Sequence, residues 1–561
     1  MGSSDRNCFE VVIIGSGFGG SVMAYRLARA GLKVCVLERG KAYAPGEFPR
    51  SPRAVADNVW DRSRGLKGLF DFWSFDSMEA VVASGLGGGS LIYANVMLRM
   101  PDEWFVIDEP NGSTRPWPVG PRQLDRHYAA VEAMLGATPY PYAASTPKTK
   151  AFLRATDAVG LERVKPLNLA VAFTADGNTR PGLPLHRKNL HHAPRSTCVG
   201  CGECDAGCNY GSKNTTDLTY LSKAKAAGAE IRTRAEALWI HPMGDEGYEV
   251  EYLRHYKDFD GKPLTESELP KRRVRARALV LSAGSLATTH LLLRNRPNLP
   301  GLSDQLGTRF SGNGDALAFV VDADKVLDPS DGPVITASAK SLDWREGGDG
   351  RGFFLQDGGY PQFFNWVRQT VLPLGTTGRL ARFAAGQVLA HVRRDPRSEV
   401  SGELRRVLGT QRTAHSLVLL GIGRSRADGV MTLRDGYLAI DWSMRNSEAY
   451  YRRVREAMEA YADAVGGRFS DNLLSRVHRV VAAHPLGGCP MGEGPDDGVV
   501  DRHGRVHGYK RLVIADGSVL PSAAGSNPSL TIAALADRFA DRLIDDVKKD
   551  RKKGLTCRSA H

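Results

Sequence analysis

The stretch FEVVIIGSGFGGSVMAYRLARAGLKVCVLERG, residues 9–40, decides the fold. Its opening apolar run, residues 9–14, predicts a buried parallel strand. Glycines follow in G-x-G-x-x-G spacing, and the apolar positions after them predict a helix that Gly31 ends. The segment KVCVL, residues 33–37, predicts a second strand, which Glu38 closes.

This order of strand, glycine turn, helix and strand is typical of a dinucleotide-binding site. Gly15, Gly17 and Gly20 permit the tight turn, let backbone amides approach a pyrophosphate, and seat the helix on the sheet. The amino end of the helix attracts the anion, and Glu38 accepts a hydrogen bond from a ribose hydroxyl. The pattern predicts dinucleotide binding but does not choose between NAD and FAD.

Composition indicates an ordinary globular protein. The 561 residues allow more than one folding unit, and apolar residues make up 42% of them. The net charge is +13, and part of this excess lies in a basic tail, residues 547–561. We interpret the tail as a solvated, frayed terminus, with attachment to anionic lipid as the alternative. Nucleic acid is not an expected partner, because no binding module accompanies the charge.

The expected location is the cytoplasm. No apolar run of about eighteen residues predicts a transmembrane helix. The first strand begins too early to leave room for a signal peptide. Clustered cysteines without an export signal favour a reducing compartment. Peripheral contact with a membrane is the alternative that the basic tail keeps open.

Three further segments resemble the glucose–methanol–choline (GMC) oxidoreductases, flavoenzymes that oxidise alcohols. They are DSMEAVVASGLGGGSLIYANVML (76–98), RALVLSAGSLATTHLLLRN (277–295) and KRLVIADGSVLPSAAGSNPSLTIAALADRFADRL (510–543). The family has these segments in the same order, as a flavin-contacting loop, a second signature and a carboxy-terminal block. The resemblance therefore implies FAD, with further contacts from Gly87, Gly89, Ser90, Asn95, Asp516, Gly517, Asn527 and Thr531.

The fold that the resemblance implies is α/β, or α+β overall. A Rossmann-like FAD-binding domain, discontinuous in sequence, would be joined to a substrate domain over an antiparallel sheet. The implied FAD-binding parts are residues 1–100, 225–310 and 480–546. The implied substrate-domain parts are residues 101–224, with a Cys-rich loop at 195–217, and residues 311–479.

Oxidising an alcohol removes a hydride from carbon and a proton from oxygen. FAD accepts the hydride at its N5 atom, so a protein group must take the proton. In VVAAHPLGGCPMGEG, residues 480–494, His484 resembles the histidine of the family's H-P-x-G motif, and histidine titrates near neutrality. Asn527 matches a position that holds His or Asn in the family. An amide cannot act as a base, so we expect Asn527 either to hold the substrate oxygen or to polarise the flavin edge, and also to cap the last helix.

Two middle stretches, residues 353–364 and 419–442, resemble the cholesterol oxidases within the family. They imply a hydrophobic secondary alcohol, such as a 3β-hydroxysteroid, oxidised to a ketone. Where those enzymes carry a proton-shuttling Glu, this chain has Gln356 beside Asp357, which puts double-bond isomerisation in doubt. The apolar segment 359–392 predicts either core helices or a hydrophobic lid for a lipid-like substrate.

The segment RSTCVGCGECDAGC, residues 195–208, has C-x2-C-x2-C-x3-C spacing, through Cys198, Cys201, Cys204 and Cys208. The bacterial ferredoxin run has this spacing, so a [4Fe–4S] cluster and plain thiols are both open interpretations. Zinc, with His191 and His192 nearby, is a third. None of these removes a hydride, so we expect an accessory role. With a cluster the acceptor would be a one-electron carrier, and without one molecular oxygen is the simplest acceptor.

Other function classes stay open at this point. The same fold could act on a sugar or another primary alcohol, or could run a non-oxidative lyase reaction, since fold does not fix function. A basic zinc protein that binds nucleic acid is the alternative outside enzymes. Substrate-driven bleaching of a bound flavin would separate these classes.

Overall fold

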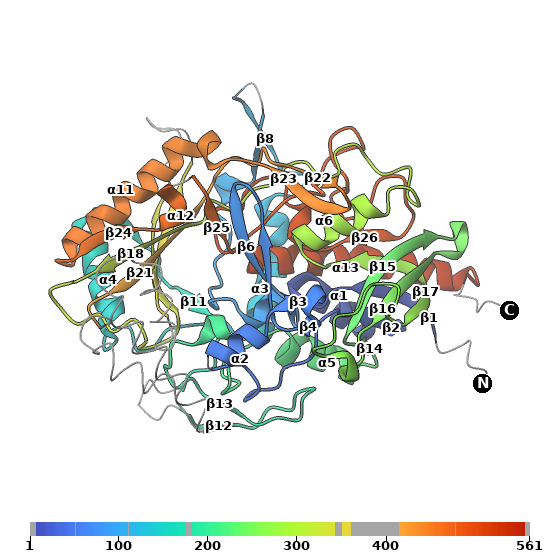
Figure 1. Cartoon of the computed structure of the whole chain (residues 1–561). Coiled ribbons are helices and arrows are strands. Elements are labelled where there is room, and N and C mark those ends of the chain that lie inside the picture. Colours follow the sequence, from blue (N-terminus) through green and yellow to red (C-terminus); the bar gives the residue numbers. More distant parts are fainter. Residues whose placement is uncertain are drawn as a thin grey trace.

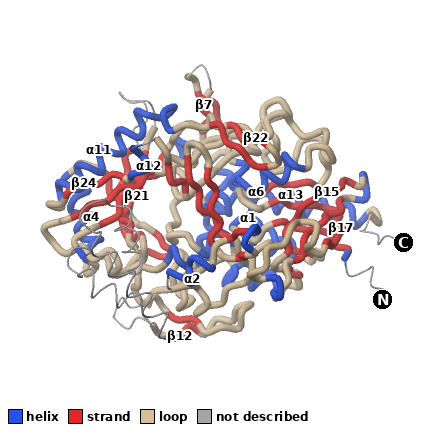
Figure 2. Tube along the Cα trace, viewed as in Figure 1, coloured by secondary structure: helices blue, strands red, loops and turns tan. Residues whose placement is uncertain are grey.

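The structure is a computed structural model that describes residues 7–50, 52–109, 112–174, 182–342, 351–360, 414–476 and 478–555. Figure 1 shows two sheets at opposite ends of the molecule, and the strand β1 (Cys8–Ile14) and the end of the helix α13 (Ser529–Lys552), near the two ends of the described chain, lie at the same end as the first sheet. Helices pack on both sheets, and long loops run between them (Figure 2).

The first sheet joins strands from three distant parts of the chain. Its order is β14-β2-β1-β17-β16-β15, and β26 also pairs with β17. The strands are β1 (Cys8–Ile14), β2 (Val34–Leu37), β14 (Glu230–Arg232), β15 (Ala235–Pro242), β16 (Tyr248–Arg254), β17 (Lys271–Leu281) and β26 (Leu512–Ile514). The pairs β14–β2, β2–β1, β1–β17 and β17–β26 are parallel. The strands β1, β2 and β26 and the second half of β17 read as nearly continuous apolar runs because both faces of this part of the sheet are buried.

Beside this sheet, the helix α13 (Ser529–Lys552) packs against both α1 (Phe18–Arg29) and α3 (Pro121–Leu135). Arg26 of α1 forms ion pairs with Asp537 and Asp541 of α13. Asp537 also accepts a hydrogen bond from Nδ1 of His127, on α3, at 2.7 Å. Side chains 511 positions apart in the sequence therefore share one polar cluster that joins the ends of the chain.

The second sheet is antiparallel throughout, with the order β10-β19-β20-β21-β18-β24. Its strands are β10 (Glu162–Arg163), β18 (Ala316–Val321), β19 (Ile335–Ser341), β20 (Phe353–Gly358), β21 (Leu417–Gly423) and β24 (Arg468–Asp471). The helices α4 (Pro147–Ala158) and α11 (Glu448–Ala464) pack on it and on each other. Phe152 and Tyr461 meet between these helices, with ring centroids 4.9 Å apart, inside a second hydrophobic core.

A small three-stranded sheet lies near the middle of the view in Figure 1. Its strand β6 (Met78–Ala83) pairs antiparallel with β5 (Phe70–Ser74) and parallel with β25 (Val480–Ala482). The remaining helices and strands are short: α2 (Pro52–Asp57), β3 (Trp60–Asp61), β4 (Leu66–Lys67), β7 (Val106–Asp108), β8 (Thr114–Pro116), β9 (Thr138–Pro139), β11 (Asn168–Leu169), β12 (Pro184–Leu185), β13 (Arg195–Ser196), α5 (Ser222–Ala226), α6 (Ser285–Arg294), β22 (Val430–Arg434), β23 (Tyr437–Asp441) and α12 (Leu473–Arg476).

The predicted fold class is confirmed, because a sheet built from discontinuous segments stands beside a separate antiparallel sheet. The first helix ends before Gly31, whose φ of +80° suits a glycine at that turn. One expectation about the end of the chain is wrong in part: α13 runs to Lys552, so the first residues of the basic tail are helical.

The proposed lid or core segment, residues 359–392, lies outside the described residues from position 361 onward. Within the described part of the chain, no helix combines the length and the apolar character needed to cross a membrane.

Candidate active site

The G-x-G-x-x-G turn, residues 15–20 and below called the fingerprint, lies where β1, β17 and β26 end together. These strands are parallel, so their carboxyl ends meet at one edge of the sheet. A Cβ atom on Gly15 would lie 2.2 Å from the carbonyl oxygen of Ser282, and one on Gly19 would lie 1.6 Å from that of Ala515. Glycine is therefore required where the turn after β1 packs against the ends of the other two strands.

The predicted glycines of this turn have different environments. A Cβ atom on Gly20 would lie 2.2 Å from the carbonyl oxygen of Gly15, so this position seats α1 on the turn. Gly17 has an ordinary φ of −67°, and no heavy atom lies within 4 Å of the place a Cβ would take. Open space therefore lies beside Gly17 at the amino end of α1, where backbone N–H groups favour an anion.

Glu38 directly follows β2 and lies at the same edge of the sheet. Its buried carboxylate accepts hydrogen bonds from the backbone N–H of Ser16 at 3.2 Å, the Ser16 hydroxyl at 2.6 Å and the backbone N–H of Gly40 at 2.8 Å. Burial raises the pKa of Glu38, and these hydrogen bonds oppose the rise. The Ser16 hydroxyl also accepts from the backbone N–H of Gly87 at 3.0 Å, which joins the fingerprint to the second predicted loop.

That loop, residues 84–95, follows β6 and lies against the fingerprint. A Cβ atom on Gly88 would lie 2.6 Å from Cα of Gly17, whereas the Cβ direction of Gly89 is open. The Ser90 hydroxyl donates to the carbonyl oxygen of Gly87 at 2.7 Å, so Ser90 braces the loop. Asn95 is fully buried at a φ of +70°, and neither polar atom of its side chain has a partner.

The turn after β26 is held by Asp516. Its carboxylate accepts from the backbone N–H and hydroxyl of Ser518, from the Thr288 hydroxyl and from the backbone N–H of Gly284. Asp516 therefore joins the turn at Gly517 to the start of α6. Its carboxylate shapes this edge of the sheet by holding the backbone of both segments in place.

The predicted Thr531 lies in the first turn of α13. Its hydroxyl hydrogen-bonds to the hydroxyl of Tyr128, on α3, at 3.0 Å. This contact ties the start of α13 to the neighbouring helix.

His484 follows β25 and is paired with Asp315, which precedes β18. Nδ1 of His484 lies 2.7 Å from Oδ1 of Asp315, and Oδ2 accepts from the backbone N–H groups of Ala483 and His484. A carboxylate only accepts, so Nδ1 carries the proton and Nε2 is left as the basic nitrogen. Burial alone lowers the pKa of His484, but the charge and hydrogen bond of Asp315 outweigh burial and raise the pKa above its ordinary value. Sequence reasoning missed Asp315, because its partner is 169 positions away.

Asn527 forms an amide pair with Gln356 of β20. Nε2 of Gln356 donates to Oδ1 of Asn527 at 2.7 Å, and Nδ2 of Asn527 donates to Oε1 of Gln356 at 3.4 Å. The expectation that Asn527 caps the last helix is wrong, since Pro528 holds the N-cap position of α13 and no side chain caps it. The side chain is instead held by the amide pair, which leaves the second N–H of Asn527 to act as a donor.

Asp357 does not take the place of Gln356. Side chains alternate along a strand, so Asp357 points to the opposite face of β20. Its carboxylate accepts from the backbone N–H groups of Thr336 and Ala337 at 2.7 and 2.6 Å and lies 3.8 Å from Nζ of Lys148. Burial raises the pKa of Asp357, and Lys148 and these hydrogen bonds oppose the rise.

The segment 311–315 holds both predicted catalytic residues in place. Asp315 binds His484, while Asn313 accepts from the backbone N–H of Gly525 at 2.7 Å and donates to the carbonyl oxygen of Ser526 at 3.0 Å. Because β25 is parallel to β6, His484 and the loop 84–95 leave the small sheet at the same edge. The contacts of Ser16, Asn313 and Asp315 therefore link the fingerprint, the second loop, His484 and the segment before Asn527 as parts of one candidate site.

Comparison with known families agrees with this geometry. Residues 9–296 and 425–536 match the amino- and carboxy-terminal regions of a family described as GMC oxidoreductase. The chain belongs to the GMC oxidoreductase family. It is therefore an FAD-dependent oxidoreductase that acts on CH–OH donors.

Several relatives share nearly the whole length of this GMC chain. A cholesterol oxidase of Mycobacterium tuberculosis is 29% identical over 97% of the chain and 92% of that protein. Long-chain-alcohol oxidase FAO4B of Arabidopsis thaliana is 25% identical over 97% of the chain and 68% of that protein. The crystal structure of pyridoxine 4-oxidase from Mesorbium loti matches with a TM-score of 0.57 and 17% identity, over 96% of this chain and 99% of that one. The last likeness supports the GMC fold alone.

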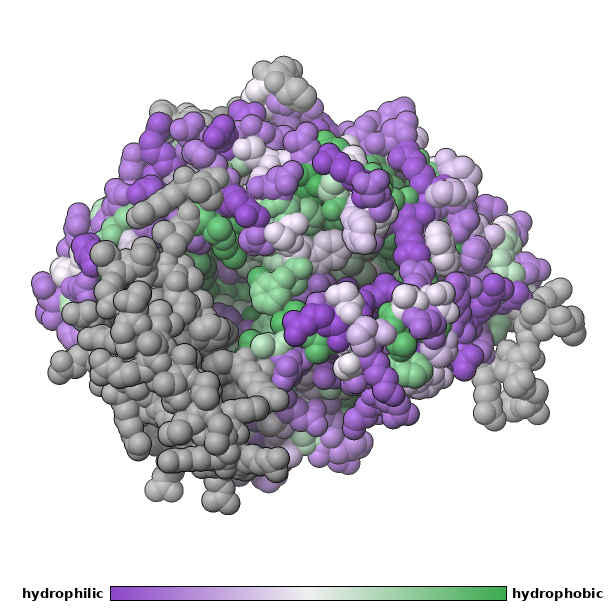
Figure 3. Space-filling view, viewed as in Figure 1, coloured by the Kyte–Doolittle hydropathy of each residue, from purple (hydrophilic) through white to green (hydrophobic). Residues whose placement is uncertain are grey.

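Apolar surface gathers in the middle of the face shown in Figure 3, where Figure 1 places β6. Phe72 of β5, the strand that pairs with β6, is 58% exposed although its side chain is large and apolar. Charged and polar residues dominate the rest of this face of the GMC chain. An exposed apolar area of this kind favours contact with an apolar ligand or surface.

The four clustered cysteines of this GMC chain line one cavity together with Lys213 and Pro333. Within the described residues, no group of three or more His, Cys, Asp or Glu is placed to hold one metal ion between them, which counts against the zinc interpretation. His191 is engaged elsewhere, because its Nε2 lies 2.6 Å from Oδ2 of Asp217.

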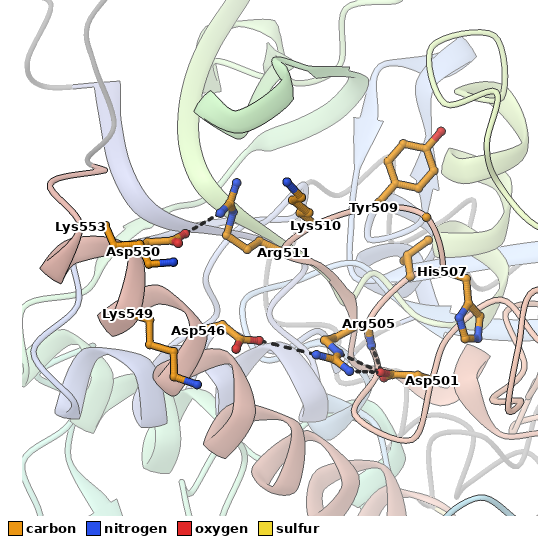
Figure 4. Close-up of a pocket in the computed structure, with 12 residues that line it drawn as sticks. Asp501, Arg505, His507, Tyr509, Lys510, Arg511, Asp546, Lys549, Asp550 and Lys553 are labelled. Carbon is orange, nitrogen blue, oxygen red and sulfur yellow. Dashed lines mark hydrogen bonds and ion pairs between the residues drawn. The ribbon is translucent and has the colours of Figure 1, made fainter.

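A charged cleft lies between the segment 501–511 and the end of α13, which packs beside the first sheet (Figure 4). Arg505 and Arg511 point toward Asp501, Asp546 and Asp550 and form ion pairs with them. At about 1.5 Å of rise per residue, Asp546 lies about 25 Å along α13 from Ser529, at the end of the helix that Asn527 precedes. The cleft is therefore separate from the GMC active site.

Proposed function

We propose that this protein oxidises a hydrophobic secondary alcohol, of the 3β-hydroxysteroid class, to a ketone. The observation that carries this proposal is the His484–Asp315 pair, which leaves a basic Nε2 atom on a residue that follows β25, at the edge of the small sheet where the loop 84–95 also begins. Family membership supplies the reaction class, and the residues of this site supply the groups that the reaction needs.

The residues of the site fit FAD. Asn95 has a buried amide without any partner, which costs free energy unless a ligand completes its hydrogen bonds. Gly17 opens onto empty space at the amino end of α1, which suits a pyrophosphate. The residues that would hold FAD are Gly15, Gly17, Gly20 and Glu38 with Gly87, Gly89, Ser90, Asn95, Asp516, Gly517, Asn527 and Thr531, several of them through the backbone they brace.

Bound FAD supplies the hydride acceptor. Nε2 of His484 takes the hydroxyl proton of the alcohol, and the carboxylate of Asp315 stabilises the imidazolium that forms. The free N–H of Asn527 donates to the substrate oxygen and so fixes the alcohol carbon in place. Gln356 keeps the Asn527 amide in that orientation by donating to its Oδ1 atom.

The product is a ketone whose carbon–carbon double bond stays where it was. Moving that bond requires a group that carries a proton between two carbons, and the amide of Gln356 cannot do so. Asp357 is held on the other face of β20 by Thr336, Ala337 and Lys148. Oxidation without isomerisation is therefore part of this proposal.

Two observations support a lipid-like substrate. The relatives named cholesterol oxidase and long-chain-alcohol oxidase match nearly the whole chain. The apolar surface of Figure 3 offers a place for a molecule with little polar surface. A long-chain primary alcohol is the second candidate, because the second of these relatives bears that name.

The test is anaerobic flavin bleaching, measured after mixing the holoenzyme with cholesterol, a long-chain primary alcohol or glucose. We expect cholesterol to remove the flavin colour fastest and to yield the unisomerised ketone. Faster bleaching by the primary alcohol would replace the steroid by the second candidate, and faster bleaching by glucose would overturn the lipid class. Adding oxygen or a one-electron dye to the bleached enzyme then identifies the acceptor by which one restores the colour.

A further inference from the structure

Four cysteines that lie within eleven positions of the sequence surround one space in the structure. The cavity lies between the Cys-rich loop and residues 332–333, which precede β19, and has an empty volume of about 340 Å³ including its mouth. The cysteines that line it are Cys198, Cys201, Cys204 and Cys208. All four are free rather than joined in disulfides. Each sulfur lies near enough to the other three for their charges to interact.

Glycines wrap the chain around this cavity. They alternate with the cysteines and have positive φ angles, so the backbone reverses direction repeatedly: Gly200 at +70°, Gly202 at +67°, Gly207 at +87° and Gly211 at +62°. A Cβ atom on Gly202 would lie 2.9 Å from the carbonyl oxygen of Ser330, and one on Gly207 would lie 2.1 Å from the ring of Phe48. The loop is therefore packed tightly on both neighbouring segments and is not a free surface turn.

Backbone N–H groups point at three of the sulfurs. Gly200 donates to Sγ of Cys198 at 3.4 Å. Cys201 accepts from the N–H of Glu203, and Cys204 accepts from the N–H of Val334. A neutral thiol sulfur is only a weak acceptor, whereas a metal-bound thiolate gains from such bonds, which tune iron–sulfur clusters.

A buried cation lies at the same cavity. Lys213 lines it with 1% of its surface exposed, and its Nζ atom donates to the carbonyl oxygens of Leu91, Tyr93 and Cys204 at 3.0, 2.8 and 2.8 Å. A buried ammonium needs nearby negative charge: Asp205 and Asp217 are close enough to interact with it, and the thiolates of a cluster would add to that charge. Leu91 and Tyr93 belong to the loop 84–95, so one lysine side chain joins the cavity to the proposed flavin loop.

We propose that Cys198, Cys201, Cys204 and Cys208 bind a [4Fe–4S] cluster, with one thiolate on each iron. A single zinc ion draws its ligands to about 2.3 Å from one centre, and the described residues contain no such group. A cubane distributes its ligands over four irons, so thiols that surround a cavity suit it better. Cys208, which serves a second cluster in two-cluster ferredoxins, lines the same cavity here and completes the set.

The proposal is tested on the full chain, produced without oxygen and reconstituted with ferrous iron and sulfide. We expect about four irons and four acid-labile sulfides per chain, with a paramagnetic signal after reduction by dithionite. Cys201→Ser and Cys208→Ser should each lower both contents by more than half, with FAD content unchanged. Cys489→Ser is the matched control, because Cys489 is buried but does not line the cavity, and it should keep the full iron content.

Fewer than one iron and one sulfide in the reconstituted wild type would overturn the proposal, whatever the variants do. One zinc ion without sulfide, or disulfides among the four cysteines in the oxygen-free protein, would overturn it as well. Iron and sulfide are counted directly, so the result does not depend on whether the protein oxidises any alcohol.

Discussion

The two sides of the active site are built by different means. On the sheet side, Gly15, Gly19 and Gly20 bring backbone to within van der Waals contact of backbone. On the opposite side, the reacting groups are held by side-chain pairs, His484 with Asp315 and Gln356 with Asn527. Where backbone packs on backbone, almost any side chain in place of glycine would clash. Where two side chains form a pair, a substitution of one partner removes only the contribution of that partner. Mutations on the two sides should therefore differ in kind as well as in size.

The largest effect is expected for Gly17→Leu. Its φ of −67° accepts a side chain and its Cβ direction is open, so the protein should fold while the leucine fills the space meant for the cofactor. We expect complete loss of bound FAD, measured by absorbance, with circular dichroism unchanged. Gly494→Leu, also at an open Cβ position, is the control and should keep FAD. A Gly17→Leu variant that keeps its FAD would contradict the assignment of the space beside Gly17 to the cofactor.

The next effect is expected for His484→Ala. Removing the base should slow flavin reduction by about a hundredfold or more while FAD stays bound, since proton transfer by a positioned side chain contributes that much. Anaerobic stopped-flow absorbance measures the rate. His186→Ala, at an exposed histidine, is the control. Reduction at the wild-type rate would remove His484 from the mechanism.

Asp315→Asn should act through His484 and is expected to slow reduction by about thirtyfold, as for the loss of about 2 kcal/mol from a hydrogen bond to a charged group. Asp315 raises the pKa of His484, and the base works only when neutral, so wild-type activity should rise with pH and level off above that raised pKa. In the variant the pKa falls, so the same rise should occur at lower pH.

The pH–rate profile of flavin reduction measures both effects of Asp315→Asn. Asp304→Asn, at an aspartate that is 97% exposed, is the control. A slower variant with an unmoved profile would mean that Asp315 is only structural.

The smallest effect is expected for Gln356→Leu. Asn527 would lose the donor to its Oδ1 atom, and about 1 kcal/mol of lost orientation corresponds to a reduction rate about fivefold lower. Gln305→Leu removes an exposed amide contact and serves as the control. A loss as large as that of His484→Ala would show that the amide pair does more than orient Asn527.

Local sequence patterns predicted the dinucleotide-binding segment well, because the strand, turn and helix of residues 9–40 are neighbours in sequence as well as in space. The antiparallel sheet and the segment order followed from resemblance and not from periodicity. The role of Asp315 could not be predicted, since nothing in the segment SGNGDA, residues 311–316, indicates that its partner His484 lies 169 positions away. The helix cap assigned to Asn527 was wrong for the same reason, because its partner lies 171 positions away on β20.

The strand β26 has a consequence for how the protein is made. It completes the parallel sheet from residues 512–514, and the carbonyl oxygen of Ala515 closes onto Gly19. A nascent chain therefore cannot complete the FAD-binding turn until residues 512–515 have left the ribosome. FAD should therefore bind only after β26 has emerged, and polypeptides terminated before residue 512 should be colourless.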